Sequence, residues 1–224
     1  TPIPRTMALT VYGDQDLSTL DELPPGRQEI VTRLVPEKKR KDAYFWISDQ
    51  VAKGRQVFIV CPLIEESEAI QVKAVTLEYE RLKTEVFPNH RLALLHGRMK
   101  SDEKDATMKQ FAAGEVDILV STSVIEVGID VPNASIMMIE GAERYGLAQL
   151  HQLRGRVGRG EAQSYCLLFT SDPEENSNTR LTFFAHTLSG IKLAEFDFKI
   201  RGPGQIFGTQ QSGYSDLKIA DLTN

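Results

Sequence analysis

Arginines and glycines alternate in one segment, Gln152–Gly160, in a way that could bind phosphate. Guanidinium groups are permanently charged and forked, so they suit paired hydrogen bonds to phosphate oxygens. Glycines allow tight backbone turns and remove side chains that would shield the charges. An isolated Arg-Gly-Arg would be better explained as a solvated basic turn. The longer string, between a predicted helix and a predicted strand, favours a phosphate site.

A second segment with functional potential, Ser121–Pro132, directly follows a predicted strand. Ligands of open α/β sheets bind outside the carboxyl ends of the strands, where this segment is expected to lie. Its serine and threonine residues could present hydroxyl groups to phosphate, ribose or a metal ion. Gly128 could present its backbone amide and Asp130 its carboxylate to the same ligands. A polar connection between two strands, with Asp130 and Pro132 in a turn, explains this segment equally well.

The elements that must position these segments are short apolar runs alternating with amphipathic stretches, from Ile30 to Thr170. The continuous apolar run at 56–61 is typical of a strand in a parallel sheet covered on both faces. The alternation predicts an α/β fold, a parallel sheet with helices on both faces. Strands are predicted at 56–61, 91–95, 117–121, 135–139 and 164–169, and helices at 67–86, 101–113 and 149–156.

The pattern changes after Thr170. A helix that begins near Ser171 and runs through Phe184, and a second near 191–198, precede a glycine-rich tail without periodicity. We therefore divide the chain into a leading segment at 1–28, an α/β domain at 29–170, and a helical hairpin with its loop at 171–224.

Composition is that of a globular protein with a sizeable core. The 224 residues are 41% hydrophobic and 25% charged, and 26 basic against 31 acidic side chains give a net charge of −5. No apolar run approaches membrane-span length and no signal peptide is recognisable, so we expect a cytoplasmic protein without membrane contact. Two cysteines, Cys61 and Cys166, exclude a disulfide scaffold and a cysteine-rich zinc module. The acidic balance is a weak argument against nucleic acid, because much of the acid lies on one predicted outer helix.

Together the two segments resemble motifs of the second motor lobe of superfamily 2 helicases and translocases, whose fold is RecA-like. The resemblance implies that Arg156 and Arg159 are arginine fingers, which neutralise charge on the γ-phosphoryl group of ATP bound to the other lobe. It implies that Gln152 helps to set the nucleotide site, and that Gly128 and Asp130 connect nucleotide to DNA.

Two earlier segments, Val57–Leu63 and Leu95–Met99, resemble the motifs of this lobe that touch the nucleic-acid backbone. The resemblance makes His96 and Gly97 candidates for DNA contact. Ser121 and Thr122 are candidates for DNA contact as well. Taken alone, His96 would be a structural histidine.

Further strings narrow the resemblance to the RecG family, namely Asp21–Arg27, Leu63–Glu68 and Arg201–Gly213. Residues 1–6 resemble the end of a first-lobe motif, so 1–28 is expected to be the linker from the first motor lobe. The family resemblance implies that Arg180, Arg201 and Gly204 couple movement of the lobes to DNA translocation. Without it, Arg180 would be a solvent-exposed helix residue, and Arg201 a charge at a helix C-terminus.

A RecG-type protein is expected to be an ATP-dependent DNA helicase that remodels replication forks and Holliday junctions in DNA repair and recombination. The sequence contains no Gly-x-x-x-x-Gly-Lys-Ser/Thr loop and no Asp-Glu-x-x-His string, so ATP and Mg²⁺ are expected to bind mainly to the first lobe. We expect no metal ligands here and no turnover by the chain alone. Its expected partners are branched double-stranded DNA and the first RecA-like lobe and wedge domain of the same protein, which is expected to be a monomer.

Two other interpretations stay open at this point. The motor end of a transcription-repair coupling factor shares the motor and the hairpin, and RNA polymerase would be its partner. A nucleotide-binding domain of a metabolic enzyme is disfavoured, because no Gly-x-Gly-x-x-Gly turn follows a predicted strand.

Overall fold

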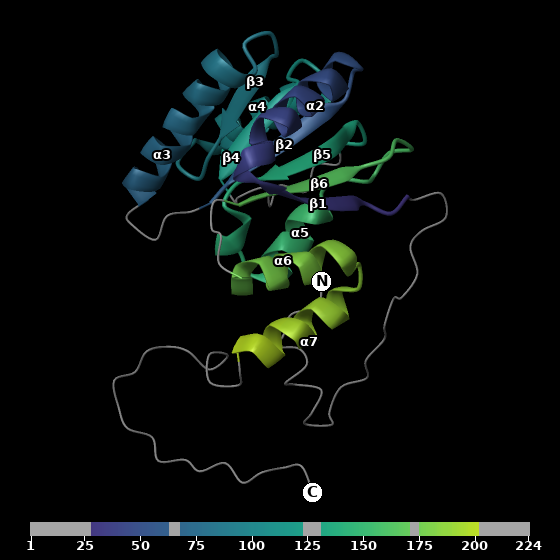
Figure 1. Cartoon of the computed structure of the whole chain (residues 1–224). Coiled ribbons are helices and arrows are strands. Elements are labelled where there is room, and N and C mark those ends of the chain that lie inside the picture. The colour runs from purple at the N-terminus through teal and green to yellow at the C-terminus, as the bar shows by residue number, and fades with distance from the viewer. Residues whose placement is uncertain (1–27, 63–67, 123–130, 171–174, 202–224) are drawn as a thin grey trace, which may run out of the picture.

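A six-stranded parallel sheet forms the centre of the molecule (Figure 1). The computed structural model describes residues 28–62, 68–122, 131–170 and 175–201. The strand order is β1-β6-β5-β2-β4-β3, and every neighbouring pair is parallel. The strands are β1 (Val31–Pro36), β2 (Gln56–Cys61), β3 (Leu92–Leu95), β4 (Ile118–Thr122), β5 (Ala134–Ile139) and β6 (Tyr165–Thr170).

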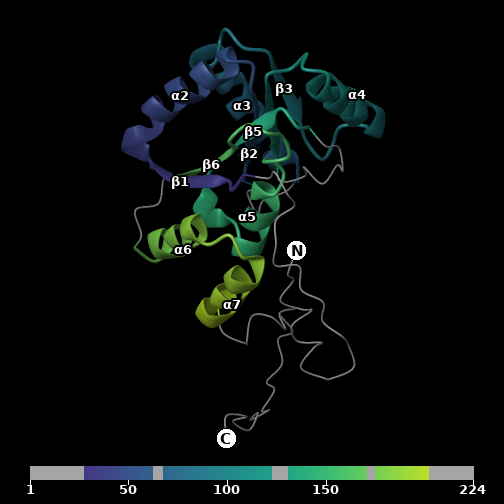
Figure 2. The same ribbon diagram turned by 90° about the vertical axis from the view of Figure 1, so that its right-hand side faces the viewer.

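Helices cover both faces of the sheet (Figures 1 and 2). One face carries α2 (Arg40–Ala52) and α3 (Glu68–Arg81), which continues as a π-helical turn, η2 (Leu82–Val86). The other carries α4 (Ser101–Ala112), α5 (Leu147–Arg154), α6 (Glu175–His186) and α7 (Gly190–Arg201). Short 3₁₀ turns, η1 (Glu37–Lys39) and η3 (Ala142–Arg144), precede α2 and α5. The predicted parallel α/β fold is confirmed.

The alternation of side chains along β2 explains why a continuous apolar run forms a central strand. All six residues of β2 are buried. Val57, Ile59 and Cys61 pack in the cluster that includes α2 and α3. Phe58 and Val60 pack in the cluster under α4, α5 and α6. Because both faces are covered, the side chains of both sets are apolar, and the one polar residue of the strand, Gln56, donates to the backbone oxygens of Phe111 and Val116.

The predicted element positions agree with the structure to within a few residues, with two omissions. The sequence interpretation named neither β1 nor α2. Helix α4 begins at Ser101, the first residue of the predicted range, and Lys100 is its N-cap residue. The Glu103 carboxylate closes that helix start by accepting the Lys100 backbone N–H at 3.1 Å. Cys61 and Cys166 are buried free thiols.

Candidate nucleotide and nucleic-acid site

Helix α5 positions the first of the arginine-rich residues. Leu147, Leu150 and Leu153 are buried in the core, at the spacing of one helix face. Gln152 therefore lies on the outer face and is exposed. The helix begins at the carboxyl end of β5 and runs back toward the start of β6, as expected for a crossover between parallel strands.

Two glycines fold the segment after α5 against the start of the sheet. Gly158 has φ +78°, and a Cβ there would lie 3.0 Å from Cγ1 of Ile30. At Gly160 a Cβ would lie 2.5 Å from the backbone oxygen of Pro132, so only glycine fits. This turn leaves Arg159 exposed and Arg156 half-buried. It also places the end of the Ser121–Pro132 segment beside the arginine-rich segment.

A second group of predicted residues lies at the carboxyl ends of two neighbouring strands. Ser121 and Thr122 end β4, and His96 and Gly97 follow β3. Leu95 pairs with Ser121 in the β3–β4 register, so the two strand ends are adjacent. The structure therefore brings these four residues together.

The two groups lie at opposite ends of the sheet, which the sequence interpretation did not anticipate. Arg156 and Arg159 lie beyond the helix that runs away from the carboxyl edge. Their segment contacts Ile30, just before β1, and Pro132, just before β5. The Ser121–Pro132 connection joins one edge to the other, because both strands it links are parallel. Gly128 and Asp130 lie outside the described residues.

Two buried polar atoms at the carboxyl edge have no hydrogen-bond partner among the described residues, Oγ of Ser121 and Nδ1 of His96. A buried polar group left unpaired costs about 1–3 kcal/mol, so such atoms are suited to contact a ligand. Burial, with a further contribution from Lys104, lowers the pKa of His96. A neutral imidazole has one donor and one acceptor nitrogen.

The hairpin is joined to the segment between β5 and α5. Arg180 of α6 is half-buried and donates from Nη2 to the backbone oxygen of Glu143 in η3. The interpretation of Arg180 as a solvent-exposed helix residue is therefore wrong. The rings of Phe183 and Phe196 stack at 3.8 Å and hold α6 to α7. Arg201 is the last residue of α7, and Gly204 lies outside the described residues.

Sequence reasoning passed over the third arginine of the string, Arg154. It is buried, with 3% of its surface exposed. Its position gave a signal that could have been used, because residues 152 and 154 lie on different faces of a helix with 3.6 residues per turn. Arg154 must then face the core if Gln152 faces solvent.

The described residues fit a phosphate group better than a metal ion. Arg156 and Arg159 supply forked donors at the surface, which match the oxygens of a terminal phosphate. Within 28–62, 68–122, 131–170 and 175–201, no group of three or more His, Cys, Asp or Glu side chains could hold a metal ion. None of the helices in these ranges is long and apolar enough to cross a membrane.

Comparison with known protein families shows to which family the chain belongs. The model of the helicase conserved C-terminal domain matches residues 38–161. The model of the C-terminal part of domain 3 of the ATP-dependent DNA helicase RecG matches residues 187–224. The chain belongs to the helicase C-terminal domain family, in its RecG form. The sequence-based RecG interpretation is thereby confirmed over the transcription-repair and metabolic alternatives.

Individual RecG proteins resemble the chain along almost its whole length. The ATP-dependent DNA helicase RecG of Thermotoga maritima is 54% identical over 99% of the chain. A solved structure of RecG bound to a three-way DNA junction matches 92% of the chain with 52% identity and a TM-score of 0.76. The chain spans 28% of the length of the Thermotoga relative and 27% of the solved RecG chain. A more distant match, the yeast protein Dbp5 bound to RNA, shares the fold at a TM-score of 0.55 and 19% identity.

Proposed function

We propose that the chain is the second motor lobe of an ATP-dependent DNA helicase that remodels replication forks and Holliday junctions in DNA repair and recombination. The observation that carries the proposal is the match to RecG on a three-way DNA junction, at 52% identity over 92% of the chain. The outward position of Gln152 and Arg159 supports it, because a second lobe must present its donors to a nucleotide held elsewhere.

In this proposal Arg156 and Arg159 contact the γ-phosphate of ATP, and Gln152 helps to set the nucleotide site. When bound, ATP supplies the phosphoanhydride bond whose hydrolysis drives movement. The guanidinium groups neutralise the charge that grows on the phosphoryl oxygens during transfer. Gly128 and Asp130 are proposed to connect nucleotide to DNA. Mg²⁺ is proposed to bind mainly to the first lobe, since the described residues offer no cluster of ligands for it.

The carboxyl edge is proposed to contact the DNA backbone. His96, Gly97, Ser121 and Thr122 lie together there, and two of these side chains bring buried polar atoms without a partner in the described residues. Contacts to phosphate and sugar position a duplex without reading its sequence. Arg180, Arg201 and Gly204 are proposed to couple lobe movement to DNA.

The remaining partners follow from the same proposal. Residues 1–28 would link the chain to the first RecA-like lobe, 29–170 would form the motor domain, and 171–224 the hairpin and translocation loop. A wedge domain of the same protein would complete a monomeric enzyme that acts on branched DNA in the cytoplasm.

The proposal is tested in the full-length protein that contains this chain. Arg159→Ala should lower kcat for ATP hydrolysis stimulated by a three-way DNA junction by about 10³-fold or more, since arginine fingers contribute about 10³–10⁵ in rate. ATP binding should change little. Arg33→Ala, which removes an exposed arginine from β1, is the matched control and should leave kcat unchanged.

Two results would contradict the proposal. A loss below about tenfold for Arg159→Ala would mean that this arginine is structural, because arginine fingers contribute far more than that. DNA-stimulated ATP turnover by the 224-residue chain alone would overturn the division of the site between two lobes.

A further inference from the structure

Arg154 is a buried cation in the middle of the arginine-rich segment. It ends α5, between the exposed Gln152 and the half-buried Arg156, with only 3% of its surface exposed. Burial lowers the pKa of its guanidinium, although an arginine keeps its charge in proteins. The fold thus holds a charged group inside, next to residues proposed to contact ATP.

The contacts of Arg154 are with backbone oxygens of another helix. Nη1 donates to the oxygen of Phe184 at 3.0 Å, and Nη2 donates to the oxygen of Thr187 at 2.9 Å. The guanidinium carbon lies 4.1 Å from the centre of the Phe184 ring. Nη2 also lies 3.1 Å from Nδ1 of His151, which must accept because arginine has no acceptor. One planar fork therefore holds α5, the ring of Phe184 and the end of α6.

These oxygens belong to the C-terminus of α6, which ends at His186. The last carbonyl groups of a helix lack partners within the helix and carry the negative end of its dipole. Of the two acceptors of Arg154, the Phe184 oxygen also accepts the Thr187 backbone N–H at 3.3 Å, and the Thr187 oxygen lies just beyond the helix. Arg154 therefore brings a positive charge to this end of α6. None of the ion pairs found in the described parts of the chain includes Arg154. Its partners are therefore the carbonyls rather than a carboxylate.

A second contact joins α6 to the same segment from the other direction. Arg180 of α6 donates to the backbone oxygen of Glu143, in the turn just before α5. The two contacts thus lie on either side of α5, one before its start and one at its end. The ribbon views show α5, α6 and α7 adjacent in both orientations (Figures 1 and 2). For α5 to move without α6, the contacts of Arg154 would have to break, and for η3 to move without α6, the contact of Arg180 would have to break.

We propose that Arg154 is a positioning residue that fixes the hairpin of α6 and α7 to α5, so that the segment with Arg159 and the hairpin move as one body. The consequence of this contact, the transfer of nucleotide-driven movement to DNA, depends on the proposed function. A purely structural requirement could be met by an apolar side chain, because replacing buried charges with well-packed apolar groups is often neutral or stabilising.

The test uses Arg154→Met and Arg154→Lys in the full-length protein. For Arg154→Met we expect an unchanged KM for ATP, a largely retained kcat, and a reduced number of DNA junctions remodelled per ATP hydrolysed. Coupling free energies of 1–3 kcal/mol correspond to about 5- to 150-fold, which is the expected range of that reduction. Arg154→Lys should restore little, because an ammonium group cannot reach two carbonyls in a fixed fork.

The matched control is Arg91→Met. Arg91 also donates from its guanidinium to a backbone oxygen beyond a helix end, that of Gly114 after α4, at 2.9 Å, but at the β3 edge of the sheet. Its loss should leave junctions remodelled per ATP unchanged. Proportional losses of hydrolysis and remodelling in Arg154→Met, or full rescue by lysine, would overturn the proposal.

Hydrogen exchange of the same proteins separates this inference from the proposed function. Arg154→Met should raise exchange in α6 and at the end of α5, whereas Arg91→Met should raise it only near α4 and β3. An unchanged α6 would overturn the positioning role whatever the enzymatic result. A full-length protein without ATP-dependent junction remodelling would contradict the proposed function, while the exchange data would still decide whether Arg154 fixes α6. If Arg154→Met does not fold, the lysine variant carries both measurements.

Discussion

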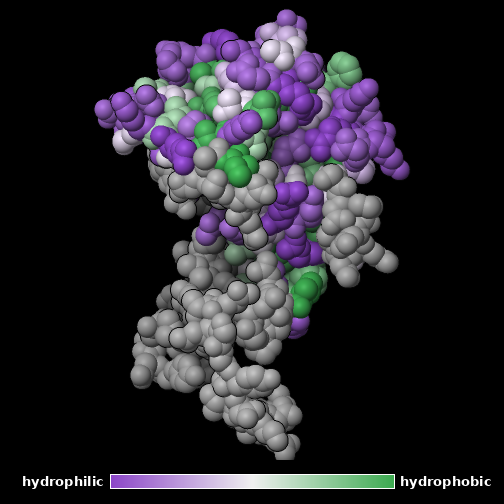
Figure 3. All heavy atoms as spheres, turned by 90° about the vertical axis from the view of Figure 1, so that its left-hand side faces the viewer, coloured by the Kyte–Doolittle hydropathy of each residue, from purple (hydrophilic) through white to green (hydrophobic). Residues whose placement is uncertain are grey.

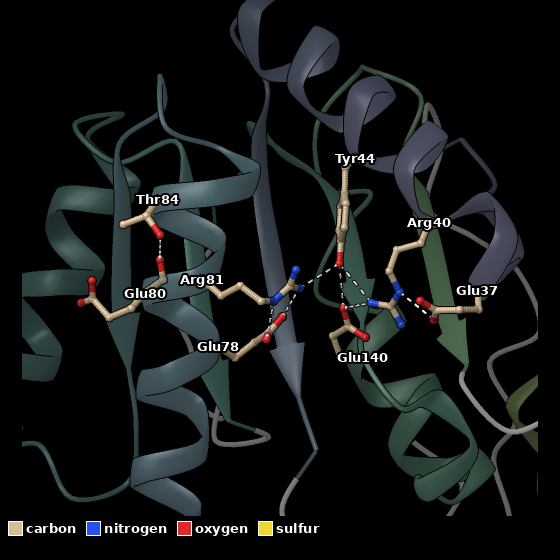
Figure 4. Close-up of polar contacts among 8 residues, drawn as sticks. All are labelled: Glu37, Arg40, Tyr44, Glu78, Glu80, Arg81, Thr84 and Glu140. Carbon is tan, nitrogen blue, oxygen red and sulfur yellow. Dashed lines mark hydrogen bonds and ion pairs between the residues drawn. The ribbon is translucent and has the colours of Figure 1, made fainter.

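The two faces of the sheet use arginine in different ways. On the α2–α3 face, the guanidinium groups pair with carboxylates of the same face: Arg40 with Glu37 and Glu140, at 3.0 and 2.5 Å, and Arg81 with Glu78 at 2.6 Å. Figure 4 shows the Tyr44 hydroxyl between the two arginines, which both donate to it. On the α5–α6 face, Arg154 and Arg180 donate to backbone oxygens of other elements.

We interpret this difference as one between a self-contained face and a face that we propose transmits movement. Charges neutralised within the α2–α3 face stabilise local packing and leave its outer surface to solvent. The side on which α3 lies is largely hydrophilic in its described part, with small hydrophobic areas (Figure 3). On the α5–α6 face, arginines that hold the backbone of a neighbouring helix make its position depend on theirs. The exposed Arg159, which is proposed to contact ATP, lies in the segment that directly follows α5.

The largest expected effect concerns the transmitting face. In the full-length protein, Arg201→Ala should spare most DNA-dependent ATP hydrolysis but reduce fork regression by about tenfold or more, within the range of coupling free energies. The reason is that Arg201 ends α7 and is proposed to act on DNA rather than on ATP. Phosphate release and unwinding of an annealed fork, at one salt concentration, measure the two activities.

Controls for Arg201 test its geometry. Arg201→Lys should rescue little if a forked donor is required. Gly204→Val, which restricts the backbone, should reproduce the separation of the two activities. Equal losses of hydrolysis and regression would remove the coupling role and with it the contrast between the two faces.

On the self-contained face, a smaller effect is expected, and it concerns the stability of the fold. Glu140→Ala leaves the largely buried Arg40 without its main partner, so the free energy of unfolding of the chain should fall by about 3 kcal/mol. Glu78→Ala is the matched control, since Arg81 is more exposed and the loss should be about 1 kcal/mol or less. Urea unfolding measures both. Equal losses would show that burial does not distinguish the two pairs.

The smallest effect is a pH dependence at the α5–α6 contact. Burial, then the charge of Arg154, lowers the pKa of His151 from 6.5 to about 4. The unfolded chain therefore binds this proton at a higher pH than the folded chain. The contribution to stability is complete above pH 6.5 and is lost as the pH falls toward 4.

His151→Gln should therefore flatten the decrease in stability over this pH range, measured by thermal unfolding at several pH values. Thr182→Gln, an exposed substitution on α6 that removes no titrating group, should leave the slope as it is. An unchanged slope in the His151 variant would mean that its imidazole is accessible to protons in the folded state.

The central strands were predictable because their burial on both faces leaves a local signal. β2, β4 and β5 are apolar throughout or nearly so, since helices cover both sides. β1 gave no such signal. It is an edge strand interrupted by the exposed Arg33 and ended by Pro36, and its one partner, β6, lies more than 130 residues away in the chain.

The candidate site was predictable in its members more than in its arrangement. Residue type and spacing predicted a phosphate site in the arginine-rich segment, with the glycines in a tight turn. The individual roles of Arg156, Arg159 and Gln152 came only from the family resemblance and stay predictions. The role of Arg154 depends on Phe184, 30 residues later, and no local pattern records that contact. The arginine-rich segment and the residues at the carboxyl edge lie at opposite ends of the sheet because α5 runs antiparallel to the strands. That direction exists only in the folded sheet and leaves no local pattern in the sequence.

The central claim is that the arginines after α5 serve a nucleotide held by another part of the same protein. The most direct measurement is a structure of the full-length protein with Mg²⁺, ADP and beryllium fluoride on a three-way DNA junction. We predict a guanidinium nitrogen of Arg159 at about 2.7–2.9 Å from the fluoride that replaces a γ-phosphate oxygen, the distance of a charge-assisted hydrogen bond. An Arg159 side chain that faces solvent or DNA in that complex, with no contact to the nucleotide, would contradict the account.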